Sequence, residues 1–115
     1  MDDRTIYIID RIVLTPGSAR AFIDAYLSGY APQARERGLT LDRILVSPPA
    51  WIDEETNTVT ATWTVAGPRA WWAAAVRARH DPEPARWWDS MAPMIVERTR
   101  SMASCAEDVE GLCDV

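Results

Sequence analysis

The 115-residue chain contains no lysine, so all 12 of its basic residues are arginines. Its 17 acidic residues outnumber them and give a formal net charge of −5. A negative protein is repelled by the phosphates of nucleic acids and by anionic lipid headgroups. We therefore expect neither nucleic acid nor a membrane as a partner. Every cation is a planar guanidinium, which can bind carboxylates through two parallel hydrogen bonds and can stack on indole rings.

Long apolar runs, histidine and cysteine are also scarce. No segment reaches the roughly 18 apolar residues that span a bilayer, and no basic stretch precedes an apolar leader, so we expect a cytoplasmic protein. One histidine and two cysteines cannot form a zinc or iron site of normal spacing. Cys105 and Cys113 both lie near the C-terminus, where a bridge would close only a small loop, so we expect free thiols. The sequence also has no phosphate-binding glycine loop, nucleophile elbow or dinucleotide fingerprint, and we predict no cofactor.

Tryptophan, in contrast, is abundant. The chain has six, and four of them form the adjacent pairs Trp71-Trp72 and Trp87-Trp88 on predicted helices. Neighbours on a helix point about 100° apart, so each pair spreads a wide aromatic arc. One interpretation places all four indoles in the core. The other places one indole of each pair against the sheet and the second against a pocket or a partner chain.

Hydrophobic periodicity predicts four strands and two helical regions. Alternation indicates strands, and apolar residues at helical spacing, with proline and glycine at their ends, indicate helices. The predicted strands are residues 5–14, 40–47, 58–66 and 94–102. The first helical region begins at Thr15-Pro16, breaks near Tyr30-Ala31 and stops at Gly38. The second begins at Gly67-Pro68, restarts at Asp81-Pro82 and ends at Pro93. In its first half, Trp71 and the small residues Ala74, Ala75 and Ala78 form a stripe that is predicted to face the sheet.

The order β-α-β-β-α-β predicts an α+β protein of the ferredoxin-like type, with helices on one face of a four-stranded antiparallel sheet. The first strand has two nearly apolar faces, and the third carries a row of four threonines between Thr58 and Thr64. A large apolar sheet face is rarely left exposed, so we expect two copies to pair through it as a dimeric α/β barrel. Residues 1–103 form the single predicted domain, and 104–115 a flexible acidic tail.

Three segments resemble a known family. They are the strand Tyr7-Ile8-Ile9-Asp10-Arg11-Ile12 followed by Thr15-Pro16-Gly17, the Trp71-Trp72 pair after Gly67-Pro68, and the Trp87-Trp88 pair followed by residues 95–100. This pattern, over residues 5 to 102, is similar to the dimeric α/β-barrel superfamily and especially to its NIPSNAP-like and stress-responsive members. The resemblance implies a homodimer with a ligand pocket between each sheet and its helices. That superfamily includes cofactor-free monooxygenases, polyketide cyclases, isomerases, lyases and haem-degrading enzymes, so the fold does not select one function.

Two residues are the main candidates for proton transfer. His80 follows the Trp71-Trp72 helix, where it is either a general acid or base or a solvated cap at the negative helix end. The resemblance adds a third possibility, a haem ligand, which nothing else in the sequence supports. Asp10 replaces an apolar residue on the first strand. It is either a base or the ion-pair partner of Arg98 or Arg100 on the neighbouring last strand.

Further side chains complete the predicted site. A tyrosine or arginine near the base, Tyr7 or Arg11, would stabilise a developing oxyanion. The walls of a hydrophobic pocket are predicted to be Tyr26, Tyr30, Trp51, Trp63, Trp71, Trp72, Trp87 and Trp88. The sequence thus predicts a cofactor-free enzyme that acts on a hydrophobic cyclic or aromatic metabolite by proton transfer, as an isomerase, cyclase, lyase or monooxygenase. The alternative is a non-catalytic barrel that binds such a ligand.

Overall fold

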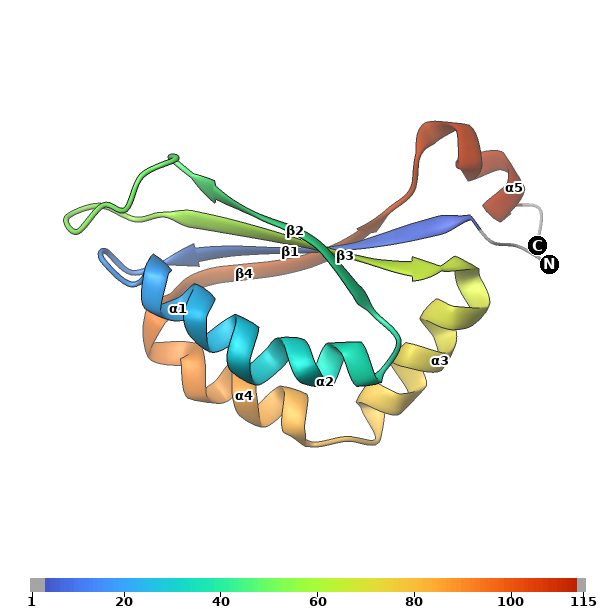
Figure 1. Cartoon of the computed structure of the whole chain (residues 1–115), viewed down its shortest axis with the longest axis horizontal. Helices are drawn as coiled ribbons and strands as arrows, with labels where there is room; N and C mark the ends of the chain where they lie inside the picture. The colour runs from blue at the N-terminus through green and yellow to red at the C-terminus, as the bar shows by residue number, and fades with distance from the viewer. Residues whose placement is uncertain (1–3, 114–115) are drawn as a thin grey trace.

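A four-stranded antiparallel sheet with helices on one face forms the body of the protein, as the computed structural model shows for residues 4–113 (Figure 1). The strands are β1 (Thr5–Leu14), β2 (Thr40–Ser47), β3 (Thr58–Ala66) and β4 (Ile95–Ala103). The helices are α1 (Ala19–Ala25), α2 (Ala31–Glu36), α3 (Gly67–Arg79), α4 (Glu83–Met91) and α5 (Val109–Cys113). Three short helical turns join them, namely η1 (Tyr26–Tyr30), η2 (Ala92–Met94) and η3 (Ala106–Asp108). The predicted ferredoxin-like order is confirmed. Among the described residues, no helix combines the length and apolar character needed to cross a membrane.

The order of the strands in the sheet is β2-β3-β1-β4, so β1 lies between β3 and β4. Both neighbours run antiparallel to β1, and Asp10 is paired with Ala61 on one side and with Arg100 on the other. Because successive side chains on a strand point to opposite faces, the same alternation decides which residues meet the helices. The buried side chains of the two central strands are Ile6, Ile8, Asp10, Ile12, Leu14, Val59, Ala61, Trp63 and Val65.

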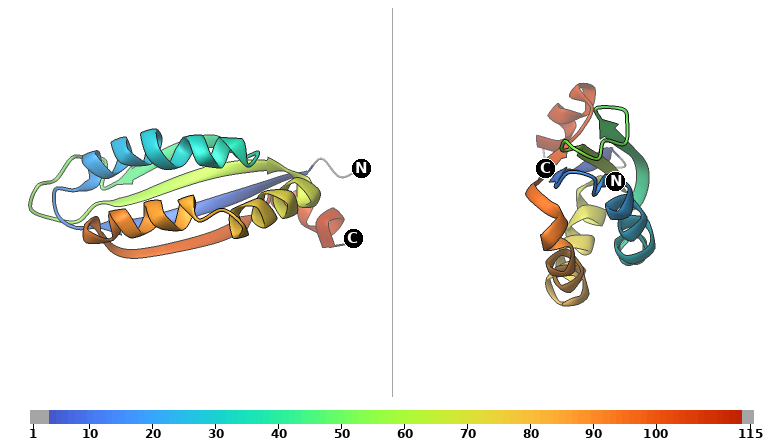
Figure 2. Two further views of the ribbon diagram at one scale, coloured as in Figure 1. Left: turned by 90° about the horizontal axis from the view of Figure 1, so that it is seen from below. Right: turned by 90° about the vertical axis from the view of Figure 1, so that its left-hand side faces the viewer.

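The first helical region is one continuous rod in place of the predicted broken helix (Figure 2). It begins at Ala19, after a turn in which Gly17 has a φ of 77°, and not at Pro16. Where a break was predicted, the backbone N–H of Ala31 donates to the carbonyl oxygen of Tyr26, which is the wider turn of a π-helix. Pro32 has no N–H to donate, and the wider turn accommodates this gap without ending the helix. Gly38, with a φ of 97°, follows the rod as predicted.

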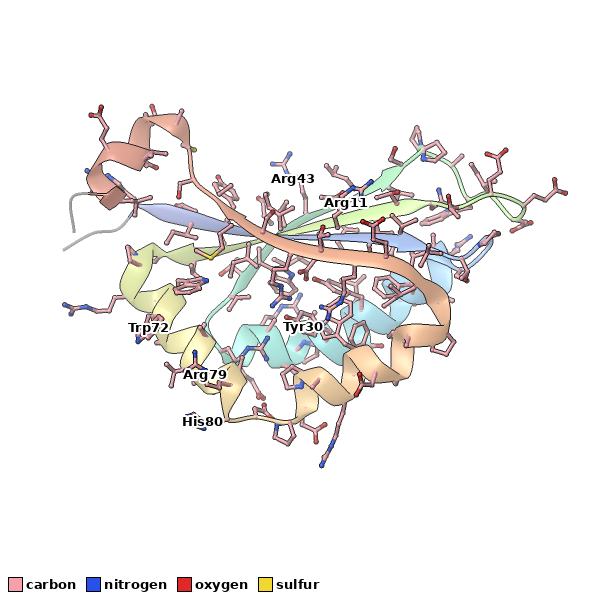
Figure 3. All side chains as sticks on the ribbon, turned by 180° about the vertical axis from the view of Figure 1, so that it is seen from behind. Arg11, Tyr30, Arg43, Trp72, Arg79 and His80 are labelled. Atoms are coloured by element: carbon pink, nitrogen blue, oxygen red, sulfur yellow. The ribbon has the colours of Figure 1, made fainter. Side chains whose placement is uncertain are left out.

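Helices α1–α4 all lie on one face of the sheet, and of the described helices only α5 is on the other, outer side, near the start of β1 (Figure 1). In Figure 3, Arg11 of β1 and Arg43 of β2 project from this outer face, whereas Tyr30 lies between the sheet and the helices. Leu45 is 54% exposed there, and the odd-numbered residues of β1 are mostly half-buried. The threonines of β3 face the same side, as their alternation predicts. This outer face is therefore a mixed apolar and hydroxyl surface.

The C-terminal segment forms helical turns as far as Cys113, where the sequence predicts a flexible tail. Ser104 Oγ donates to the carbonyl oxygen of Thr5 at 3.1 Å, and Leu112 packs against the core. Arg4 and Asp108 form a wide, partly exposed ion pair at 4.0 Å. These contacts attach the segment to the start of β1 and to the core.

Removing residues 104–115 tests the strength of this attachment. Since a half-buried leucine contributes about 1 kcal/mol, we expect the melting temperature to fall by about 3–6 °C. Leu112→Ala should reproduce most of that fall in thermal unfolding. Val109→Ala is the control, because Val109 is 45% exposed and should change the melting temperature little. A truncated protein that melts like the full chain would support the predicted flexible tail instead.

Candidate functional site

Asp10 lies at the centre of a hydrogen-bond network between the sheet and the first helical rod. The carboxylate is fully buried, since 0% of its surface is exposed. Tyr26 donates its hydroxyl proton to Asp10 Oδ2 at 3.0 Å, and Trp63 Nε1 donates to the Tyr26 oxygen at 2.6 Å. Burial, followed by the negative charge of Asp10, raises the pKa of Tyr26 well above the ordinary value of a phenol. Tyr26 therefore remains protonated and acts as a fixed donor.

Arg100 of β4 supplies the charge partner of Asp10. Its Nε donates to Oδ1 at 2.6 Å and its Nη2 to Oδ2 at 2.9 Å, which is a bidentate pair. Burial lowers the pKa of Arg100, but the hydrogen bonds and charge of Asp10 outweigh burial and raise it above its ordinary value. The geometry confirms the ion-pair interpretation of Asp10 and selects Arg100 over Arg98. Both carboxylate oxygens are thus occupied by donors.

A second guanidinium reaches the same network from the end of the helical rod. Tyr30 Oη accepts a hydrogen bond from Arg100 Nη2 at 2.7 Å and another from Arg37 Nη2 at 3.1 Å. Arg37 is only 7% exposed, and its Nη1 has no hydrogen-bond partner in the described part of the chain. The phenol oxygen of Tyr30 therefore joins two cations, of which only Arg100 is paired with a carboxylate among the described residues.

Aromatic rings fill the space between α4 and the helical rod. The ring centroids of Trp87 and Trp88 are 4.8 Å apart in an edge-to-face arrangement, and both rings contact Tyr26 and Tyr30. Gly29 permits this packing, because a Cβ at that position would lie 2.4 Å from Nε1 of Trp87. Trp87 and Trp88 thus pack against the rings of both tyrosines of the network, Tyr26 and Tyr30.

An apolar cavity of about 400 Å³ opens beside the two arginines. We call it the arginine cavity; its walls are Ile8, Arg37, Leu39, Trp71, Ala74, Ala75, Ala78, Arg100, Ser101 and Met102. The small residues of the predicted stripe, Ala74, Ala75 and Ala78, line this cavity. A second cavity of about 370 Å³ shares Arg37 and is lined also by Gln33, Glu36, Val76, Arg77, His80 and Asp81. Arg37 therefore borders both spaces.

The four predicted catalytic residues lie in three different places. Asp10 belongs to the buried network, whereas Tyr7 and Arg11 extend from the outer face of the sheet because they alternate with Asp10 on β1. His80 is exposed at the C-terminal cap of α3, which is the predicted capping position (Figure 3). It faces the second cavity and does not line the arginine cavity. The structure does not bring these four side chains together as one set.

The predicted wall residues are divided between core and surface. Tyr26, Tyr30 and Trp63 are buried in the network, and Trp88 is 9% exposed beneath the guanidinium of Arg98, at 4.0 Å from its ring centroid. Trp87 is half-buried in the aromatic layer, and Trp71 lines the arginine cavity. Two wall residues point outward, Trp72 at 57% and Trp51 at 52% exposed. Trp51 lies instead beside Arg20, 5.7 Å from its guanidinium carbon.

Arg37 is the site residue that the sequence analysis did not identify. A signal was present, because positions 26, 30 and 37 recur at helical spacing and so share one face of the rod. Arg100 was named only as a partner of Asp10 and not as part of a cavity. Within residues 4–113, no group of three histidine, cysteine or acidic side chains is placed to hold a metal ion. Chemically, the site offers the guanidinium donors of Arg37 and Arg100 to an oxygen atom at the edge of an apolar space.

The α+β fold, with its ferredoxin-like order of strands and helices, is shared with solved NIPSNAP family proteins. An uncharacterised NIPSNAP domain protein from Burkholderia xenovorans is 13% identical, with a TM-score of 0.69 over 88% of this chain and 94% of the other. A NIPSNAP family protein of unknown function from Agrobacterium tumefaciens is 12% identical, with a TM-score of 0.68 over 90% of each chain. A candidate antibiotic biosynthesis monooxygenase from Nitrosomonas europaea is 12% identical, with a TM-score of 0.60 over 92% and 94%. No protein-family model and no curated protein matches the sequence. These likenesses establish a shared fold and leave the function to the site itself.

Proposed function

We propose that this protein is a cofactor-independent enzyme that acts on a hydrophobic ring compound by proton transfer. The reaction would be an isomerisation, cyclisation or lyase step, or an oxygenation that begins from the same substrate carbanion. One observation carries the proposal: Arg37 and Arg100 form a polar corner in the mainly apolar arginine cavity, and the buried oxygen of Tyr30 accepts a hydrogen bond from each of them. An apolar pocket with a few convergent polar groups is the usual form of a small-molecule site.

The polar corner suits the stabilisation of an enolate. When a proton leaves a carbon next to a carbonyl group, the electron pair of the C–H bond moves onto the carbonyl oxygen as negative charge. The guanidinium of Arg100 is oriented in advance by Asp10, so it can donate to that oxygen without reorganisation. In this proposal His80 takes up the proton from a part of the ligand that extends past Arg37 into the second cavity, because imidazole exchanges protons near neutral pH and a guanidinium does not relay them.

A second candidate function is a barrel that binds the same ligand without catalysis. It is favoured by the lining of the arginine cavity, which in the described part of the chain includes no aspartate, glutamate or histidine. Both functions require ligand binding, and they differ in whether a proton is transferred. A ketone probe with an exchangeable C–H separates them.

We expect the protein to exchange the acidic C–H protons of 2-tetralone for deuterium in D₂O at least about 10²-fold faster than buffer does, the usual size of a general-base contribution. NMR would follow the exchange, and tryptophan fluorescence would follow binding. His80→Gln should remove the acceleration and leave the fluorescence titration unchanged. Quenching without accelerated exchange would favour the binding barrel, and the absence of both would contradict the proposal.

Two substitutions on α3 form a matched control. Ala75 lines the arginine cavity, so Ala75→Leu should fill it and abolish both quenching and exchange. Ala73 is exposed on the same helix, so Ala73→Leu should change neither. Equal effects of the two changes would place the probe outside the cavity.

We also propose that the protein functions as a homodimer that is paired through the outer sheet face. The apolar side chains available for this are Tyr7, Ile9, Val13 and Leu45, and no helix covers them. The protein should therefore sediment as a dimer at micromolar concentration. Ile9→Glu should produce monomers, because it would place a carboxylate in the pairing surface. A folded monomer of the unmodified protein would refute this pairing.

A further inference from the structure

Arg37 is a buried cation without a counter-ion among the described residues. Its side chain is more than nine-tenths buried, since the residue is 7% exposed. It donates one hydrogen bond, from Nη2 to Tyr30, and its guanidinium carbon lies 5.6 Å from the centroid of the same ring. Nη1 finds no acceptor. A buried donor without a partner is costly to a folded protein, and a buried charge more so, which makes such a group a frequent mark of a binding site.

The surrounding charges do not balance Arg37. The network contains two guanidiniums and the single carboxylate of Asp10, which Arg100 engages with two hydrogen bonds. Of the residues that line the two cavities bordered by Arg37, the acidic ones are Glu36 and Asp81, both in the second cavity. Neither forms an ion pair with Arg37. The network thus has an excess of one positive charge in a setting of low polarity.

The arginine cavity provides space for an apolar body next to this unbalanced charge. Trp71, Leu39 and Met102 line it, and its charged residues among those described are Arg37 and Arg100 alone. A neutral ring compound would fill the apolar space and leave Nη1 of Arg37 without an acceptor. A ring compound with an anionic oxygen group would satisfy both parts of the site, once the Arg37 side chain turns the enclosed Nη1 toward the cavity.

From this arrangement we propose that the ligand of the arginine cavity is a carboxylic acid with an aromatic or alicyclic body, and that Arg37 binds its carboxylate. Guanidinium and carboxylate match in shape and charge. Hydrogen bonds between such charged groups are shorter and stronger than hydrogen bonds between neutral groups. Arg37 is then the anchor that sets the orientation of the ring, with a second oxygen of the ligand directed to Arg100. This assignment rests on the proposed function only in using the same cavity.

The test compares two probes of equal shape, 2-naphthoate and the neutral 2-naphthamide, by quenching of tryptophan fluorescence in the full-length protein. We expect the protein to bind the carboxylate about 10- to 100-fold more tightly than the amide, the factor that one charge-assisted hydrogen bond contributes. Arg37→Met keeps the apolar stem and should remove this preference. Arg35→Met on the same helix is the control, because Arg35 is exposed and should leave the preference intact.

Equal binding of the two probes by the unmodified protein would overturn the inference, whether or not the Arg37→Met variant folds. A carboxylate preference that survives in a folded Arg37→Met variant would overturn it as well. The outcome is separable from that of the proposed function. Accelerated exchange of 2-tetralone without a carboxylate preference would support the proposed enzyme and reject the anionic ligand. A carboxylate preference without accelerated exchange would support the anionic ligand and reject the proposed enzyme.

Discussion

Asp10→Asn should lower the free energy of unfolding by about 3 kcal/mol, near the lower end of the range for removing one partner of a buried ion pair. The carboxylate is fully buried, whereas the side chain of Arg100 is 40% exposed and can recover part of its hydration. The amide can still accept from Tyr26 and Arg100, but it carries no charge and brings a donor that the network does not need. Urea unfolding followed by tryptophan fluorescence, at one fixed protein concentration, measures the change.

Asp42→Asn is the matched control for this experiment. Asp42 also forms an ion pair, with Arg43 at 3.1 Å, but both side chains are partly exposed and solvent screens them. We expect a change of at most about 1 kcal/mol there. If Asp10→Asn costs no more than Asp42→Asn, the buried network is not a main source of stability, and Asp10 would again be a candidate for a catalytic role.

Trp88→Ala should be comparably damaging, with an expected loss of about 3–5 kcal/mol, the range for truncating a large buried aromatic side chain. The indole is 9% exposed, with its ring 5.3 Å from Tyr30 and 4.0 Å from the guanidinium carbon of Arg98. Its removal would leave a cavity between α4, the helical rod and β4. The same urea experiment measures this loss.

Trp72→Ala is the corresponding change in the other tryptophan pair. Trp72 is 57% exposed, and among residues 4–113 its one ring neighbour is Trp71, with the two ring centroids 5.7 Å apart. Surface substitutions of this kind usually change stability by less than about 0.5 kcal/mol. A large loss for Trp72→Ala would indicate that this ring is covered in the native assembly, for example by a second copy of the chain.

The sheet could be predicted from the sequence because its signal has a period of two. The alternation in 5–14 and 58–66 identifies the buried face of β1 and β3, and it places Asp10 among the core residues. The ferredoxin-like order then makes β4 its neighbour, so Arg98 or Arg100 could be named as the partner in advance, and the register of β1 and β4 decides for Arg100. Arguments of this type need only the direction and pairing of strands.

Other parts of the site depend on how the helices are rotated, which the sequence specifies less directly. The stripe on α3 predicts that Trp71 faces the sheet, but both rings of the Trp87-Trp88 pair are packed because α4 lies against the helical rod as well as β4. Arg37 escaped attention because a charged residue at the end of a helix is ordinarily solvated. The docking of Leu112 depends on a tertiary contact that no periodicity announces.

The close approach of Gly29 to Trp87 makes the two positions dependent on one another. A side chain at 29 and an indole at 87 cannot occupy the same space, because a Cβ at 29 would lie 2.4 Å from Nε1 of Trp87. A homologue with alanine at 29 should therefore carry a smaller residue at 87, and a homologue that has lost the indole is free to gain a side chain at 29. In an alignment of homologues, the side-chain volumes at 29 and 87 should therefore vary in opposite directions. Such covariation would indicate the contact between the helical rod and α4 from sequences alone.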